Sequence, residues 1–130
     1  MNEVYEFLKK CGVYYLGTTD GNCPRVRPFG TVDLYKDNLY IQTGKIKDVS
    51  KQMHANPNIE ICAMLGGEWI RVRAKAYAED DREARVHMLD AYPELKAMYS
   101  PDDGNTEVFR LTDVYAEICS FTAPKKVFTF

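Results

Sequence analysis

The sequence predicts a mainly β domain of the α+β class, in which a small antiparallel barrel of about six strands carries helices at its periphery. Segments rich in β-forming residues recur along the chain, and turn signals separate them at intervals of about eight to twelve residues. The most regular segment, residues 68–79, alternates between a cationic face and an aliphatic face. No internal repeat or linker divides residues 1–130, so we expect a single domain.

The expected strands are the segments in which β-forming residues lie between turn signals. In chain order they are residues 13–19, 25–35, 38–43, 59–65, 68–79 and 106–122. The last of them is expected to be broken near Thr112 and Asp113. Pro28 has no amide hydrogen to donate to a neighbouring strand. Residues 25–35 should therefore lie at a sheet edge, or break where a ligand can approach.

Apolar residues at helical spacing predict the helices. These cover residues 2–11, a segment that begins near Gly44 or Lys45 and ends before Pro57, and residues 80–99 in two pieces divided at Pro93. In the middle helix, the side chains expected to face the core are Ile46, Val49 and Met53.

Composition argues against several classes of function. Hydrophobic residues make up 45% of the chain and charged residues 28%, and the formal net charge of −2 argues against general binding to nucleic acid. No apolar run is long enough for a membrane span, and residues 1–12 are amphipathic rather than a signal peptide. The four cysteines form no CxxC pair and no cluster with histidine, so we expect a reduced, cytoplasmic protein without a metal site.

Basic residues gather around the turn that precedes the expected middle helix. Arg25 and Arg27 are two positions apart on an expected strand, so their side chains share one face. Lys45 and Lys47 fall in or beside the first helical turn, where the helix dipole disfavours cations. A bound phosphate would remove this conflict, and Thr43 adds a hydroxyl donor. The alternative is a solvated basic surface, because short motifs of this kind often occur by chance.

A second basic face lies on the regular strand over residues 68–79. Its members are Trp69, Arg71, Arg73 and Lys75. Such a face does not belong to a core. It is either solvated, or it lines a site for a planar, anionic ligand.

Three stretches in a fixed order carry a resemblance to a known family. They are RVRPFG at 25–30, LYIQTGKIKDVSKQMHANPNIEICA at 39–63, and EWIRVRAKA at 68–76. With these stretches, the chain resembles the pyridoxamine 5′-phosphate oxidase-related family of FMN-binding split barrels. The resemblance implies a six-stranded antiparallel split β-barrel, and a homodimer with two FMN sites at the subunit interface. The aromatic side chains of the tail, residues 123–130, would then pack on the neighbouring subunit or in their own core.

The resemblance also implies roles for individual positions. Arg25 and Arg27 would contact phosphate or ribityl oxygens, and the backbone at 28–30 would face the isoalloxazine ring. Lys47 would hold the phosphate. Together with the charge argument, the expected cofactor-binding residues are Arg25, Arg27, Pro28, Phe29, Gln42, Thr43, Lys45, Lys47, Trp69 and Arg71. The last two would approach the ligand from the same or the other subunit.

The chain departs from the family pattern at its C-terminal end. Pyridoxamine phosphate oxidases proper end in a segment with arginine and histidine that binds the substrate, whereas this chain ends in PKKVFTF. Its only histidines, His54 and His87, fall on expected helices as surface or satisfied residues. Oxidation of pyridoxamine phosphate is therefore not expected.

The leading hypothesis is an FMN-dependent oxidoreductase that acts on a small-molecule substrate or electron acceptor. Small members of the family that the chain resembles include nitroimidazole-reducing resistance proteins and flavin reductases. Two alternatives stay open: storage or sensing of FMN without turnover, and binding of another phosphorylated cofactor such as an F420-type deazaflavin. No acid or base stands out in the sequence, so no catalytic residue is assigned.

Overall fold

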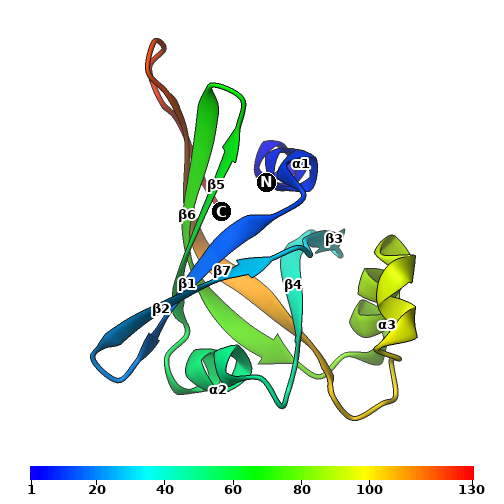
Figure 1. Cartoon of the computed structure of the whole chain (residues 1–130). Helices are drawn as coiled ribbons and strands as arrows, with labels where there is room; N and C mark the ends of the chain where they lie inside the picture. The colour runs from blue at the N-terminus through cyan, green and yellow to red at the C-terminus, as the bar shows by residue number, and fades with distance from the viewer.

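The computed structural model describes the whole chain, residues 1–130, as a curled antiparallel sheet with helices around it (Figure 1). The elements in chain order are α1 (Asn2–Cys11), β1 (Tyr14–Asp20), β2 (Cys23–Phe29), β3 (Asp33–Tyr35), β4 (Asn38–Gly44), α2 (Asp48–Ala55), β5 (Asn58–Leu65), β6 (Glu68–Glu79), α3 (Arg82–Ala91), the 3₁₀ helix η1 (Pro93–Ala97), β7 (Thr106–Ser120) and β8 (Lys126–Thr129). The mainly β class with peripheral helices is confirmed.

The sheet has eight strands rather than the expected six, and it does not close. The strand order is β2-β1-β5-β6-β7-β4-β3, with β8 added beside β7. One extra strand arises because the segment expected over 25–35 divides: β2 pairs with β1, and β3 pairs with β4. Four peptide units, from Phe29 to Asp33, connect the two ends of this order, and they span at most about 14 Å. The two edges therefore lie close together, and the sheet curls into a split barrel. The edge position expected from Pro28 is confirmed.

The second extra strand is the tail. β8 pairs antiparallel with β7 from Tyr115↔Thr129 to Ile118↔Lys126. Phe128 and Phe130 pack against the main core, so of the two places expected for the tail aromatics, they take the core of their own chain. The break expected near Thr112 is also absent. β7 runs through as one strand, and an irregularity in its pairing with β6 lies beside Asp113, whose φ is +50°.

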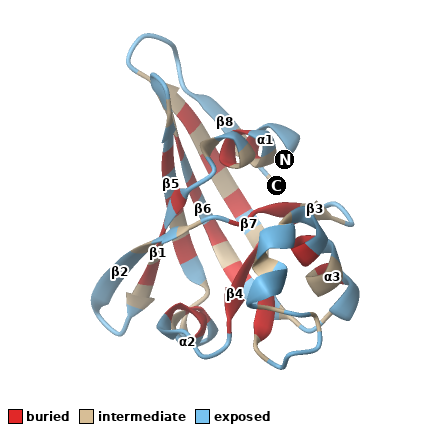
Figure 2. Cartoon of the chain, turned by 45° about the vertical axis from the view of Figure 1, so that its right-hand side comes forward, coloured by how far each residue is buried: buried red, intermediate tan, exposed pale blue.

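The main core lies inside the curled sheet and is closed by two helices. Buried positions alternate along the long strands, as Figure 2 shows in red for β6 and β7. On β6 the buried face is the aliphatic one expected from the sequence: Ile70, Val72, Ala74 and Ala76. α1 adds Val4, Phe7 and Leu8 at one end of the barrel, and α2 adds Val49 and Met53 at another.

The segment 80–99 forms two helical pieces, as expected. Asp81 caps α3 by accepting hydrogen bonds from the amides of Glu83 and Ala84. After Pro93 the chain continues as the 3₁₀ helix η1. A second, small core joins α3 to β4 and β7, and its members are Tyr40, Ala84, Met88 and Val108. None of the helices is both long enough and apolar enough to cross a membrane.

Candidate functional site

The turn between β4 and α2 differs from the expected helix start. α2 begins at Asp48, with Lys47 as its N-cap, three to four residues later than the sequence predicts. Residues 44–47 instead form a turn bound to Asn105: the Lys45 amide donates to the Asn105 carbonyl oxygen (2.8 Å), and the Ile46 amide to its Oδ1 (3.2 Å). Ile46 was expected to face the core and is 78% exposed, because it lies in this turn and outside the helix.

Gly44 allows this close contact between sequence-distant segments. A Cβ atom at this position would lie 2.9 Å from Nδ2 of Asn105 and 3.2 Å from the hydroxyl oxygen of Tyr99. The Lys47 amide donates to the Gly44 carbonyl oxygen (3.0 Å), which completes the turn. The loop before β7 therefore determines where the α2 N-terminus lies, and places Lys47 at the end of β4.

A basic hollow of about 870 Å³ lies between α2 and the β1–β2 hairpin. Its charged lining residues are Arg25, Arg27, Lys47, Lys51, Asp20 and Asp48. Four cations therefore face two carboxylates. Arg25 is 3.7 Å from Asp20, and both side chains are at least half exposed. Neither Lys47 nor Lys51 makes an ion pair, so the hollow carries an uncompensated positive charge.

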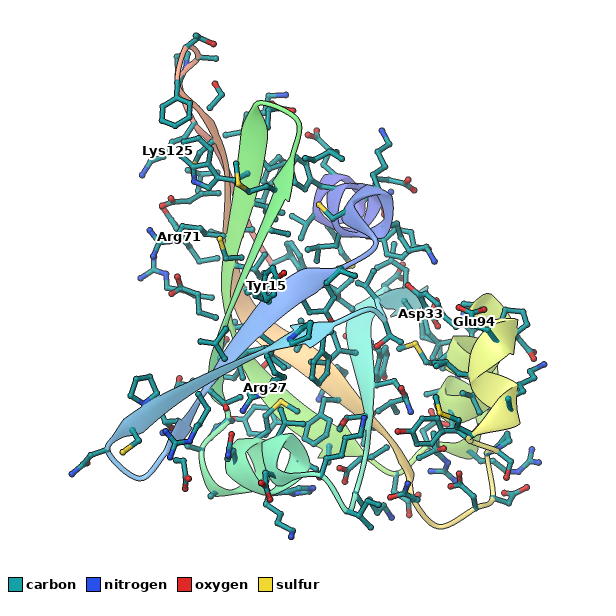
Figure 3. All side chains as sticks on the ribbon, viewed as in Figure 1. Tyr15, Arg27, Asp33, Arg71, Glu94 and Lys125 are labelled. Carbon is teal, nitrogen blue, oxygen red and sulfur yellow. The ribbon has the colours of Figure 1, made fainter.

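Arg27 fastens β2 to β1 and to α2 (Figure 3). Its Nη1 donates to the Leu16 carbonyl oxygen (3.1 Å) and to Oγ1 of Thr18 (2.8 Å), and its Nη2 donates to Oε1 of Gln52 (2.6 Å). Burial, with the nearby charge of Arg25, lowers the pKa of the Arg27 guanidinium from its usual value. All three acceptors are neutral. The charge of Arg27 thus remains available to the hollow, while its geometry is fixed by the fold.

A second hollow of about 290 Å³ adjoins the first, and Lys47 lines both. One wall comes from the β2–β3 connection and β4: Pro28, Phe29, Gly30, Thr31, Gln42 and Thr43. The opposite wall comes from the segment around η1: Tyr92, Glu94, Leu95, Met98 and Tyr99. Apart from Lys47 and Glu94, this lining carries no charge.

Side chains hold the backbone of the β2–β3 connection in place. Thr31 Oγ1 accepts from the Gln42 amide (3.0 Å) and lies 3.4 Å from the Gln42 carbonyl oxygen, to which it donates. The hydroxyl of Tyr14 donates to the Thr31 carbonyl oxygen (2.6 Å), and burial raises the pKa of Tyr14 well above its usual value. The hydroxyl of Tyr92 accepts from the Val32 amide (3.0 Å) and donates to the Val32 carbonyl oxygen (3.1 Å). This wall of the second hollow is therefore a preformed surface.

Both histidines have partners, as expected. His54 lies 2.8 Å from Glu107, a buried carboxylate that also accepts from the hydroxyl of Ser50 (2.5 Å). His87 lies 2.5 Å from the buried carboxylate of Asp33. These contacts anchor α2 and α3 to the sheet.

The structure brings together seven of the ten predicted site residues. Arg25, Arg27 and Lys47 line the basic hollow, and Pro28, Phe29, Gln42 and Thr43 join Lys47 in the second. Lys45 lines neither. Trp69 and Arg71 lie on the outer face of the barrel, where Arg71 binds Glu60 at 2.7 Å and Trp69 packs on Phe121.

Three parts of the lining were not predicted from the sequence: Lys51 of the basic hollow, and Thr31 and the wall from Tyr92 to Tyr99 in the second hollow. Lys51 could have been found, because it lies one helical turn after Lys47 and so on the same face of α2. Thr31 and the wall from Tyr92 to Tyr99 give no such signal. They reach the site only through the β2–β3 connection and through packing between distant segments.

The comparisons with known proteins agree with this architecture. The family model described as "Pyridoxamine 5'-phosphate oxidase" matches residues 1–117. The chain belongs to the pyridoxamine 5′-phosphate oxidase family. The resemblance carried by residues 25–30, 39–63 and 68–76 is thereby confirmed. None of the curated proteins matches the chain.

Solved structures extend the comparison. A NimC/NimA family protein from Clostridium acetobutylicum is 44% identical, with a TM-score of 0.97 over 100% of this chain and 92% of that chain. A pyridoxamine 5′-phosphate oxidase-related, FMN-binding protein from Nostoc punctiforme is 16% identical, with a TM-score of 0.69 over 98% and 91% of the two chains. A FAD-binding protein from Mesorhizobium loti is 18% identical, with a TM-score of 0.64 over 92% and 94%. The last two show the shared fold.

The two arginines of β2 should differ sharply in what they do for stability. Arg27→Met removes the hydrogen bonds that a charged donor makes to Leu16, Thr18 and Gln52, and it leaves these acceptors without that donor, so we expect a loss of about 2–3 kcal/mol in the free energy of unfolding. Arg25→Met, the matched control, loses an exposed ion pair and an exposed hydrogen bond to the Pro24 carbonyl oxygen, and should change stability by about 0.5 kcal/mol or less. Urea unfolding followed by circular dichroism measures both. Equal losses would contradict the fastening role of Arg27.

Proposed function

We propose that this protein binds FMN and uses it to reduce a small organic molecule. The observation that carries the proposal is the position of Lys47, which joins a hollow of net positive charge to a hollow that is mostly neutral. FMN has the same division, with a doubly negative phosphate at one end and a planar ring system at the other. The phosphate would lie in the basic hollow and the isoalloxazine ring in the second.

The donor set of the basic hollow fits a phosphate monoester. Lys47 is the N-cap of α2, where unpaired backbone amides and the helix dipole already favour an anion. Lys51 and Arg25 add cations on either side, and none of the three has a strong ion pair within the chain. A phosphate would relieve their mutual repulsion and accept charge-assisted hydrogen bonds.

The lining of the second hollow fits the flavin ring. Its β2–β3 wall offers backbone groups at residues 28–31, and the buried side chains of Gln42 and Thr43 add polar atoms at its edge. Tyr14, Thr31 and Tyr92 hold this backbone, so little ordering is needed on binding. The names of the related proteins that bind FMN or FAD support the choice of a flavin.

The reaction class follows from the cofactor. FMN supplies transfer of hydride or electrons, and the residues of this chain bind it, orient it and shield it from water. Glu94 is the only carboxylate that lines the second hollow, and no cysteine or histidine lines it. Reduction of an acceptor at the flavin ring needs no further catalytic side chain. Oxidation of pyridoxamine phosphate is not part of the proposal.

A second copy of the chain would complete the site. The pairing registers place Pro28, Tyr15, Cys62 and Arg71 in one row across the outer face of β2, β1, β5 and β6. The row begins at Pro28, which lines the second hollow. Within the row Tyr15 is 53% exposed, and on the strands and turn that continue this face Met64 is 66% exposed and Phe121 88%. Covering this face with its copy would bury them, and would bring the partner subunit's surface to the hollow.

Binding of FMN should depend on Lys47 and not on Lys45. Lys47→Met removes the cation at the junction of the two hollows, so we expect FMN affinity to fall by at least about tenfold. Lys45→Met is the matched control and should retain wild-type affinity, because Lys45 lines neither hollow. Quenching of FMN fluorescence on titration with apoprotein measures both. The proposed position of the phosphate would be wrong if the protein binds no FMN, or if the two variants lose the same FMN affinity.

Turnover separates a reductase from a storage protein. Under anaerobic conditions, NADH or NADPH should bleach the absorbance of bound oxidised FMN, and a quinone or nitroaromatic acceptor should restore it. With acceptor in excess, many equivalents of the reduced nucleotide should be consumed per flavin. Consumption of one equivalent or none, with every acceptor tried, would favour storage or sensing of FMN.

The outer face should control assembly. Met64→Arg places a cation among the exposed apolar side chains of β5 and β6, and should convert a dimer into a monomer. Ile46→Arg is the control, because Ile46 is also an exposed apolar residue but lies in the turn before α2. Light scattering after gel filtration gives the mass. A wild-type monomer at micromolar concentration would argue against a shared site.

A further inference from the structure

The second hollow has an unbalanced charge on one wall. Of its twelve lining residues only Lys47 and Glu94 are charged. Under the proposed function, the FMN phosphate neutralises Lys47. Glu94 makes no ion pair, and Lys96, the only cation of η1, is bound to Asp90 at 2.7 Å. Glu94 is therefore the only charged lining residue on the η1 side, and Lys9 lies outside the lining, with its Nζ 4.1 Å from the centroid of the Tyr92 ring.

The rest of this wall is apolar or aromatic. Tyr92, Leu95, Met98 and Tyr99 line the hollow together with Glu94, which Figure 3 shows on the helical segment at the side of the sheet. Met98 is 72% exposed although it is a large apolar side chain, so it is free to contact a ligand.

Two contacts hold this wall at a fixed distance from the β2–β3 wall. The Tyr92 hydroxyl bonds to both backbone groups of Val32, and Tyr99 approaches the backbone of Gly44. The η1 wall is therefore a fixed part of the hollow rather than a mobile flap.

From these observations we propose that Glu94 selects the electron acceptor by charge. The site takes planar acceptors that are neutral or cationic, and it discriminates against anionic ones. This inference rests on the proposed function, because the acceptor must approach the flavin ring through the second hollow. Glu94 and Met98 are exposed, so they flank the side from which an acceptor reaches the flavin ring. A negatively charged acceptor there would be repelled by Glu94, and no cation that lines the hollow remains to offset the repulsion.

The negative charge of Glu94 also disfavours substrates that carry a phosphate group. A pyridine that carries a phosphate group belongs to the disfavoured class, because the only cation of this hollow is already engaged by the cofactor phosphate. An uncharged quinone or a nitrogen heterocycle without an acidic group belongs to the favoured class, and its flat ring can lie against the side chains of Tyr92 and Met98.

The test compares two quinones that differ in charge. FMN-loaded protein is reduced with dithionite, freed of excess reductant, and mixed anaerobically with menadione or with a naphthoquinone sulfonate. Two electrons and two protons pass to the quinone, which becomes a hydroquinone, and the flavin returns to its oxidised form. Recovery of the oxidised flavin absorbance gives a second-order rate constant for each acceptor. The two quinones differ in potential, so the informative quantity is the sulfonate-to-menadione ratio, compared between variants.

We expect Glu94→Gln to raise this ratio about fivefold and Glu94→Lys to raise it at least about tenfold, through faster reaction of the sulfonate. Glu68→Gln, at the start of β6 and outside the second hollow, should leave the ratio unchanged. A ratio that stays constant in FMN-loaded Glu94 variants overturns this inference alone. A wild-type protein that binds no FMN overturns the proposed function, and this inference with it.

Discussion

The site depends on the turn that Asn105 holds between β4 and α2. Backbone and side-chain oxygens of Asn105 bind the amides of Lys45 and Ile46, and the missing Cβ of Gly44 lets the loop approach. The turn delays the helix start to Asp48, so Lys47 becomes its N-cap at the point where the two hollows meet. If the helix began at Gly44, Lys47 would lie within its first turn rather than cap it at this junction.

Polar contacts that serve the fold also shape the site. Arg27 joins three elements through neutral acceptors, so one side chain both fixes the basic hollow and contributes charge to it. Thr31 and Tyr92 likewise serve both the fold and the second hollow: they hold the backbone that connects β2 to β3, and they line the hollow themselves. That connection links the two ends of the strand order, and this is why the open edge of the barrel and the site coincide.

Prediction from the sequence was most accurate where a periodic pattern determines the local structure. The alternation in residues 68–79 identified β6 with its bounds and its buried face, and the stripe in residues 2–11 identified α1. It was wrong where two sequence-distant segments decide the outcome. Residues 25–35 have the propensity of one strand, but their two halves bond to different partners. The tail carries no clear strand signal alone, and it becomes β8 because β7 offers an edge.

By itself the sequence determined the fold class and the family, and it pointed to three of the four cations of the basic hollow, Arg25, Arg27 and Lys47, because strand alternation, helical spacing and ordered motifs are local properties. Tertiary structure decided which cations share a hollow and which, like Arg71, bind a carboxylate on the outer face. It also supplied the wall from Tyr92 to Tyr99 and the uncompensated charge of Glu94. These depend on distances between atoms far apart in the chain, and no pattern of neighbouring residues encodes them.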